Sequence, residues 1–342
     1  MRQYRGAEKN VSGKAISVRM PIVTIEALED EIRRIEEESK GQLFLYRGQE
    51  HNWPPIPSAA RYFMKPGGSL YSYQFEHMVD DLRKVHPAIS HWMVNRTFAD
   101  ILEELYPNYS SWFPGSDREL IQFLFQALRQ QYSRSAMFLD VSSNIGVALK
   151  MGIMSFYGEN KPSSDGRPIL RARLSDSEYT YLSVFKVPQD SILEFDPNPS
   201  NYLKVARYLR GRAHSSEYGL YFALNCSKMW RAKRLVNQSS WFLGYMPSDD
   251  YDHSLAPYDF SGAFHRDVLQ ISTSLIPLYL ERRYTSDRCI SLYPQDDEVL
   301  SWVNNRRVER EFAISTSTLK YNDLGISVYH YFPELDDLYI PI

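Results

Sequence analysis

The chain has 342 residues, a net charge of −3 and a hydrophobic fraction of 43%, which suits one large domain or two packed lobes with a sizeable core. This charge excludes a global basic field for nucleic acids or membranes, and no stretch approaches the length of a membrane span. The two cysteines, Cys226 and Cys289, are far apart and form no CxxC. With no apolar run near the N-terminus to suggest a signal peptide, we expect a cytoplasmic protein with reduced thiols.

The hydrophobic pattern predicts a mixture of helices and strands. In chain order these are a helix at 24–39, a strand at 42–48, a loop at 51–68, helices at 69–85 and 116–131, a strand at 137–140, a helix at 144–156, a strand at 179–187, a helix at 202–212, strands at 218–224 and 241–246, a loop at 249–260, and helices at 276–284 and 298–312. Because strands and helices do not alternate regularly, the predicted fold class is α+β, with a split or strongly bent mixed sheet and flanking helices.

The expected organisation is a basic N-terminal segment at 1–23 and one domain at 24–342. Helical insertions are expected near 69–130 and 276–312. The chain has no GxGxxG, GxxxxGK[ST], HExxH or GxSxG motif, and its eight histidines suggest no metal triad. These absences disfavour Rossmann dehydrogenases, P-loop NTPases, zincins and α/β-hydrolases, and we expect no metal site.

Four separated segments are notable for their order along the chain. They are LYRGQ with PSAAR (45–49 and 57–61), QQYSRSAMFLDVSSNIGVAL (130–149), EYGLY (217–221), and LGI with FPELD (324–326 and 332–336). In this order they resemble the motifs of FRG domain proteins. The chain departs from the family pattern at Gln131, Ser133 and Ala136–Met137, which replace His, Gly and Thr-Arg, and at Glu217, where Gln is usual.

The same segments are similar to a divergent ADP-ribosyltransferase core, by fold-level analogy and motif order. That superfamily has an Arg on its first strand, Ser or Thr before a helix, and a Glu at the edge of a later strand. The resemblance implies NAD as the substrate and a carboxylate that stabilises an oxocarbenium-like centre. It assigns catalysis to Glu217 and Arg47. It assigns contacts with NAD to Arg47, Gln49, Tyr132, Ser142, Ser143 and Asn144.

Each assignment has a plainer interpretation. Arg47 is then an end-of-strand cation, Ser142 and Ser143 are a helix N-cap, and Glu217 is a surface carboxylate. Glu194, flanked by apolar residues, is the second candidate acid, and Asp140 is expected to be structural, bonding to the backbone.

The resemblance therefore implies an NAD-dependent ADP-ribosyltransferase. It is expected to be the toxin of a phage-defence or toxin–antitoxin system, with a protein or nucleic-acid target, an antitoxin partner and no membrane partner. The alternative is a non-catalytic FRG module that binds a nucleotide or a protein. A carboxylate facing Arg47 across one cleft distinguishes the two.

Overall fold

The computed structural model describes residues 20–57, 60, 101–109, 117–132, 137–158, 169–249, 256–283, 289–294, 296–299, 330–331 and 339–341. The prediction for 69–85, nearly all of that for 298–312, most of the PSAAR segment and all of the LGI and FPELD segments lie outside these residues. Most of the basic segment 1–23 also lies outside them.

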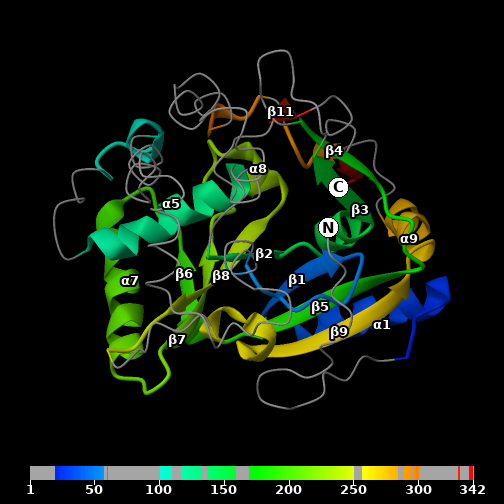
Figure 1. The fold of residues 1–342 in the computed structure, drawn as a ribbon, viewed down its shortest axis with the longest axis horizontal. Helices are drawn as coiled ribbons and strands as arrows, with labels where there is room; N and C mark the ends of the chain where they lie inside the picture. Colours follow the sequence, from blue (N-terminus) through cyan, green and yellow to red (C-terminus); the bar gives the residue numbers. More distant parts are fainter. Residues whose placement is uncertain are drawn as a thin grey trace, which may run out of the picture.

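Helices and strands are mixed along the chain, as an α+β fold requires (Figure 1). The helices are α1 (Ile25–Glu38), α5 (Arg118–Tyr132), α6 (Ile145–Gly152), α7 (Pro199–His214), α8 (Lys233–Asn237) and α9 (Leu275–Arg283). The strands are β1 (Leu43–Gln49), β2 (Leu139–Ser142), β3 (Met154–Gly158), β4 (Ile169–Leu174), β5 (Tyr179–Val187), β6 (Ile192–Glu194), β7 (Leu220–Asn225), β8 (Ser240–Met246), β9 (His265–Ser272), β10 (Cys289–Ser291), β11 (His330–Tyr331) and β12 (Tyr339–Pro341).

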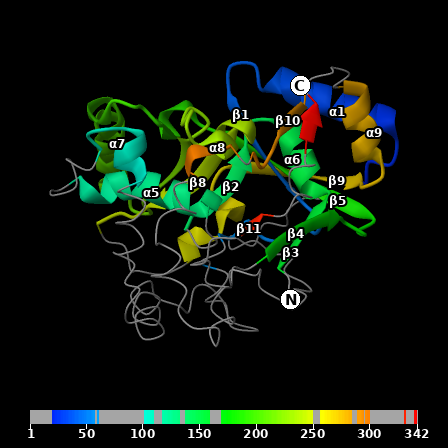
Figure 2. The ribbon, with the colours of Figure 1, turned by 90° about the horizontal axis from the view of Figure 1, so that it is seen from above.

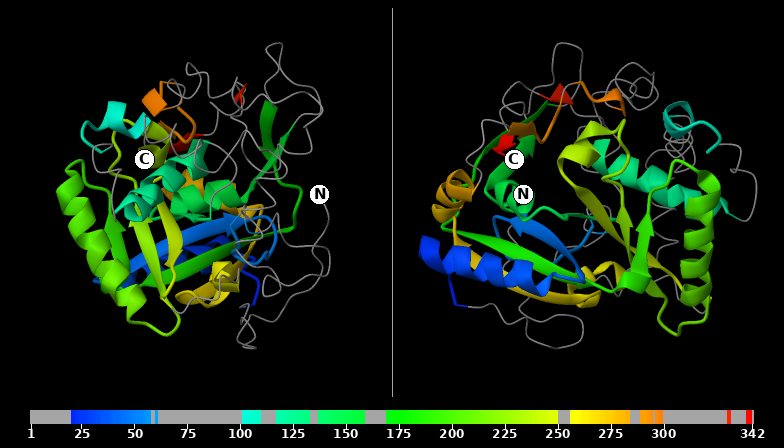
Figure 3. Two further views of the ribbon diagram at one scale, coloured as in Figure 1. Left: turned by 60° about the vertical axis from the view of Figure 1, so that its left-hand side comes forward. Right: turned by 180° about the vertical axis from the view of Figure 1, so that it is seen from behind.

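A seven-stranded sheet forms the centre of the fold, in the order β6-β7-β8-β2-β1-β5-β9. Its neighbouring strands are antiparallel, apart from the parallel pair of β6 and β7. In Figure 1 and in the right view of Figure 3, β5 and β9 run in a very different direction from β7. The sheet is therefore mixed and strongly twisted, which excludes a regular parallel sheet.

The strands β1 and β2 form a narrow joint in the middle of this sheet. They pair in register at one position, Tyr46 with Ser142, whereas β1 pairs with β5 at seven positions from Leu43 to Gln49. The strands β6, β7, β8 and β2 therefore form one half of the sheet, and β1, β5 and β9 form the other. The two halves diverge beyond this joint.

Each half of the sheet packs against its own helices. The apolar faces of α5 and α7 pack with Phe222, Leu224 and Phe242 in one core cluster. The helices α1, α6 and α9 pack with β1, β5 and β9 in a second cluster. Seen from above, α5 and α7 lie at one end of the molecule and α1 and α9 at the other (Figure 2). Two core clusters therefore flank the joint between β1 and β2.

The helix α1 illustrates how local sequence sets these elements. Thr24 has extended backbone geometry, and its hydroxyl accepts a hydrogen bond from the backbone N–H of Ala27, so it caps the helix. Four residues at helical spacing are buried against β1, β5 and β9, namely Ile25, Leu28, Ile32 and Ile35. Both the position of this helix and its buried face agree with the sequence prediction for 24–39.

Gly48 allows α6 to pack directly on β1. A Cβ atom at Gly48 would lie 1.9 Å from the backbone oxygen of Ala148 and 2.9 Å from the Cα atom of Gly152. Both neighbours are backbone atoms, which cannot be moved by rotating a side chain. The glycine that follows Arg47 is thus required by helix packing.

We predict that Gly48→Ala lowers the free energy of unfolding by about 3 kcal/mol or more, the upper range for overpacking. Gly211→Ala is the matched control, because Gly211 lies within α7 and an added Cβ would meet nothing within 4 Å. The control should gain up to about 1 kcal/mol from helix propensity. Urea unfolding measures both, and equal stability of Gly48→Ala and wild type would contradict the packing argument.

Candidate functional site

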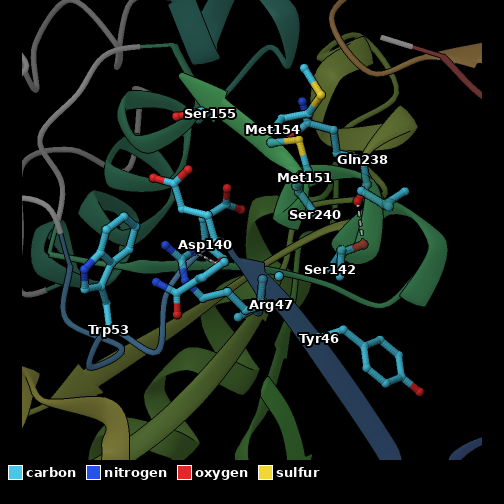
Figure 4. A pocket seen from close by; sticks show the side chains of 16 residues that line it. Tyr46, Arg47, Trp53, Asp140, Ser142, Met151, Met154, Ser155, Gln238 and Ser240 are labelled. Carbon is cyan, nitrogen blue, oxygen red and sulfur yellow. Dashed lines mark hydrogen bonds between the residues drawn. The ribbon is translucent and has the colours of Figure 1, made fainter. Parts of the chain in front are cut away.

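A cavity of about 330 Å³ lies where β1 diverges from β2 (Figure 4). One wall comes from the end of β1 and the following turn, and the opposite wall comes from β2 and the start of β8. Val147, Ala148 and Met151 of α6 and the first residues of β3 close the remaining side. The polar and aromatic side chains that line the cavity include those of Arg47, Gln49, Glu50, Trp53, Asp140 and Ser240.

Arg47 bridges the gap between the two halves of the sheet. Its Nη1 donates a 2.5 Å hydrogen bond to the backbone oxygen of Asp140, a carbonyl that lies beyond the single paired position of β1 and β2. Its Nε is buried and has no hydrogen-bond partner in the part of the chain that the structure describes. Burial lowers the pKa of Arg47, and the negative charge of Asp140 opposes this shift.

Asp140 is the second charged group of this pair. Burial raises the pKa of its carboxyl to about 6, although the positive charge of Arg47 acts in the opposite direction. The main-chain carbonyl of Asp140 accepts the hydrogen bond from Arg47, whereas the prediction that its side chain bonds to the backbone stays a prediction. Its side chain, however, lines the cavity, and a carboxyl with a pKa near neutrality suits proton transfer.

Glu50 and Trp53 complete the wall that follows β1. The Glu50 carboxylate accepts a 3.0 Å hydrogen bond from the hydroxyl of Ser175, and its side chain is 16% exposed. Trp53 packs edge-on against His51, with ring centroids 4.8 Å apart, and lines the same cavity as Arg47 (Figure 4). The cavity therefore combines one cation, two carboxylates and an indole ring that a planar base could stack against.

The Ser142–Asn144 segment is held by internal hydrogen bonds. The Ser142 hydroxyl donates to the backbone oxygen of Gln238 and accepts from the backbone N–H of Asn144. The side chain of Asn144 caps α6 by accepting from the N–H groups of Gly146 and Val147. The expectation that the serines form the N-cap is therefore corrected to Asn144. Ser142 lines the cavity, whereas Ser143 is exposed and its hydroxyl lies 3.5 Å from the oxygen of Ser239.

Tyr132 lies in a different environment from Arg47. Its hydroxyl donates a 2.6 Å hydrogen bond to Asp297, and its ring lies 5.1 Å from the guanidinium carbon of Arg234. It is buried at the end of α5 and does not line the cavity. The expectation that one pocket is lined by Arg47, Tyr132 and the whole 142–144 segment therefore holds for Arg47 and Ser142 and is wrong for Tyr132, Ser143 and Asn144. Gln49 does line the cavity.

The structure separates Glu217 from Arg47. The backbone oxygen of Glu217 lies 3.5 Å from the hydroxyl of Ser248, beyond the end of β8, whereas Ser240 at the start of β8 lines the cavity. The six residue steps of β8 span about 20 Å. Glu217 is exposed, and its hydrogen bond with Tyr218 raises the pKa of that tyrosine. This geometry corrects the expectation that Glu217 faces Arg47 across a cleft.

Glu194, the second candidate acid, is also remote from this cavity. It is exposed at the end of β6, three strands from β2 in the order of the sheet, and forms a 2.5 Å ion pair with Lys228. Among the described residues, the carboxylates that line the cavity together with Arg47 are Glu50, on the same wall, and Asp140, on the opposite wall. Glu50 could have been considered from the sequence, since it lies three residues after Arg47. Nothing in the local sequence shows that the side chain of Asp140 faces a cavity.

No group of three or more His, Cys, Asp and Glu side chains among the described residues is arranged to hold a metal ion. None of the helices found in those residues is long and apolar enough to cross a membrane. Cys226 is a free thiol, and burial raises its pKa, whereas the side chain of Cys289 lies outside the described residues.

We predict that Asp140 gives stability an unusual dependence on pH. Its pKa is raised in the folded chain, from about 3.9 when unfolded, so ionising Asp140 opposes folding. Its contribution to the free energy of unfolding should therefore fall as the pH rises from about 4 to about 6. The stability difference between wild type and Asp140→Asn should change by about 1 to 2 kcal/mol between these limits.

Urea unfolding at a series of pH values measures this difference, and a difference independent of pH would contradict the prediction. The control is Asp176→Asn, at a carboxylate whose side chain is 88% exposed.

Comparison with known proteins adds no relative from which a role could be transferred. No family model matches the chain, and neither a curated protein nor a solved structure matches it. The similarity of its motifs to FRG domains therefore stays a prediction from the sequence. Function has to be argued from the chemistry of the site.

Proposed function

We propose that this chain cleaves the bond between nicotinamide and ribose in NAD and transfers the ADP-ribose to an acceptor. The observation that carries the proposal is a carboxyl with a pKa of about 6, Asp140, in the same cavity as Arg47, Glu50 and Trp53. Paired carboxylates around a sugar are the usual chemistry for breaking a glycosidic bond. The cavity lies at the small end of the range for ligand sites, which suits the nicotinamide and ribose half of NAD.

The bond that breaks needs stabilisation of positive charge at the sugar and no acid for the leaving group. Nicotinamide is a pyridinium in NAD and takes the electron pair of the broken bond, so it leaves as a neutral base. Positive charge then develops at the anomeric carbon, where a carboxylate stabilises it. Glu50 is our assignment for this role. Trp53 would stack on the nicotinamide ring, and Arg47 would bind the phosphates.

The acceptor has to lose a proton when it attacks the sugar. Its oxygen or nitrogen forms the new bond to the anomeric carbon, and Asp140 is our assignment for the base that takes the proton. A base with a pKa near neutrality is effective at physiological pH. With water as the acceptor, the products are nicotinamide, ADP-ribose and a proton. A protein or nucleic-acid acceptor follows the same steps.

A binding module without turnover is the second candidate. It is favoured by the internal hydrogen bonds of Ser142 and Asn144, which commit their polar groups to holding β2, α6 and the residues before β8. Such a module would bind NAD through Arg47 and Trp53 and release no nicotinamide. The roles of a toxin, an antitoxin partner and a cytoplasmic location remain part of the proposal from resemblance.

We predict that incubating the full chain with NAD releases nicotinamide, measured by mass spectrometry, and that Asp140→Asn and Glu50→Gln each lower the rate at least ~10²-fold. The rate should rise with pH through about 6, because Asp140 acts in its ionised form. The control is Glu281→Gln, at an exposed carboxylate of α9.

Glu217→Gln discriminates between the two assignments of the acid. The motif order predicts a loss for this variant, whereas the position of Glu217 at the far end of β8 predicts the wild-type rate. If wild type binds NAD and releases no nicotinamide, the binding module is correct and the enzymatic proposal is wrong.

A further inference from the structure

Arg266 is a second cation on the same face of the sheet as Arg47, and both are half-buried. It lies on β9 opposite Phe185 of β5, which in turn lies opposite Leu45 of β1, so these side chains share one face. Arg47 is two residues after Leu45 and therefore shares this face as well.

The guanidinium of Arg266 extends across β5 toward β1. Its Nε and Nη2 donate hydrogen bonds of 3.2 Å and 2.9 Å to the hydroxyl of Ser183. Ser183 is the residue of β5 that pairs in register with Arg47. A single hydroxyl thus anchors Arg266 beside the strand position from which Arg47 enters the cavity.

Both guanidinium groups keep an unused N–H. Nη1 of Arg266 and Nε of Arg47 are buried and lack hydrogen-bond partners among the described residues. A buried donor left unpaired destabilises the fold, because it has lost its hydrogen bonds to water. Burial lowers the pKa of Arg266 to about 10. Asp259 raises that pKa and Arg47 lowers it further, so the two cations are close enough to repel each other.

Asp140 and Asp259 offset part of the repulsion between these two half-buried cations, but the two unpaired N–H groups still lack acceptors, which an anion bound beside them would supply. The planar guanidinium group matches the geometry of phosphate oxygens. Two guanidinium groups attract a doubly charged anion more strongly than a single guanidinium group does. Arg47 lines the cavity, whereas Arg266 is absent from its wall. Arg266 is therefore a positioning residue, which acts through its charge and through Arg47.

We infer that Arg47 and Arg266 form a phosphate subsite, in which Arg47 contacts the anion and Arg266 strengthens its binding from behind. The ligand class is a phosphorylated nucleotide. The identification of that phosphate with the pyrophosphate of NAD rests on the proposed function, whereas anion binding itself does not.

The test measures the affinity of the full chain for inorganic pyrophosphate, ADP-ribose and the unphosphorylated nicotinamide riboside by isothermal titration calorimetry. Arg266→Gln should lower the affinity for pyrophosphate and for ADP-ribose at least 10-fold. It should change the affinity for nicotinamide riboside by less than 2-fold. Arg266→Lys keeps the charge and should lose less than Arg266→Gln. Loss of all three ligands to the same extent would assign Arg266 to packing on Phe185 and overturn the inference.

Ser183→Ala gives a second measurement if Arg266→Gln fails to fold. This variant removes the hydroxyl that anchors Arg266 and keeps both charges. It should lower the affinity for pyrophosphate about 3-fold or more and leave the affinity for nicotinamide riboside unchanged. No binding of pyrophosphate by wild type would overturn the inference even if NAD is cleaved. Binding of pyrophosphate that depends on Arg266, without cleavage of NAD, would support the inference and reject the proposed reaction.

Discussion

The hydrogen bond from Arg47 to the main chain of Asp140 is the interaction on which the site depends. Neighbouring strands of a sheet usually satisfy one another's backbone groups along their whole length. Here β1 and β2 pair in register at one position, and a guanidinium serves the next carbonyl in place of a backbone N–H. The strands can therefore diverge without leaving that carbonyl unpaired, and the space between them is the cavity.

The consecutive residues Arg47 and Gly48 meet two structural requirements at the same point of β1. Arg47 turns into the gap between the strands, and Gly48 presents no Cβ to the helix on the other face. Because α6 approaches so closely, Val147, Ala148 and Met151 can line the cavity. Asn144 begins this helix directly after β2, so the second wall and the closing helix come from one short stretch of chain. The motif is thus explained by packing and by charge together.

Hydrophobic periodicity predicted α1, β1, β5, α7, β7 and β8 because each has a regular apolar pattern of its own. It extended the 144–156 helix through what is β3, since Met154 and Phe156 continue the apolar run after Gly152. Hydrophobic periodicity does not fix the position of Glu217 relative to Arg47. Motif order places it before β7 but cannot say that the antiparallel pairing of β7 with β8 carries it away from Ser240. Tertiary pairing also decides that Asp140 faces Arg47.

The charges around the cavity lower the stability of the fold. Burial lowers the pKa of Arg47 and Arg266 and raises that of Asp140, so each of the three groups is less favourably ionised here than in water. A chain selected for stability alone would replace them with apolar residues of similar volume. Departures from the rules of stability are expected at functional sites, where a ligand restores the missing interactions. An anion beside Arg47 and Arg266 would supply acceptors for their unpaired N–H groups, and its charge would favour protonation of Asp140. Ligand binding and the proton affinity of Asp140 should therefore be coupled.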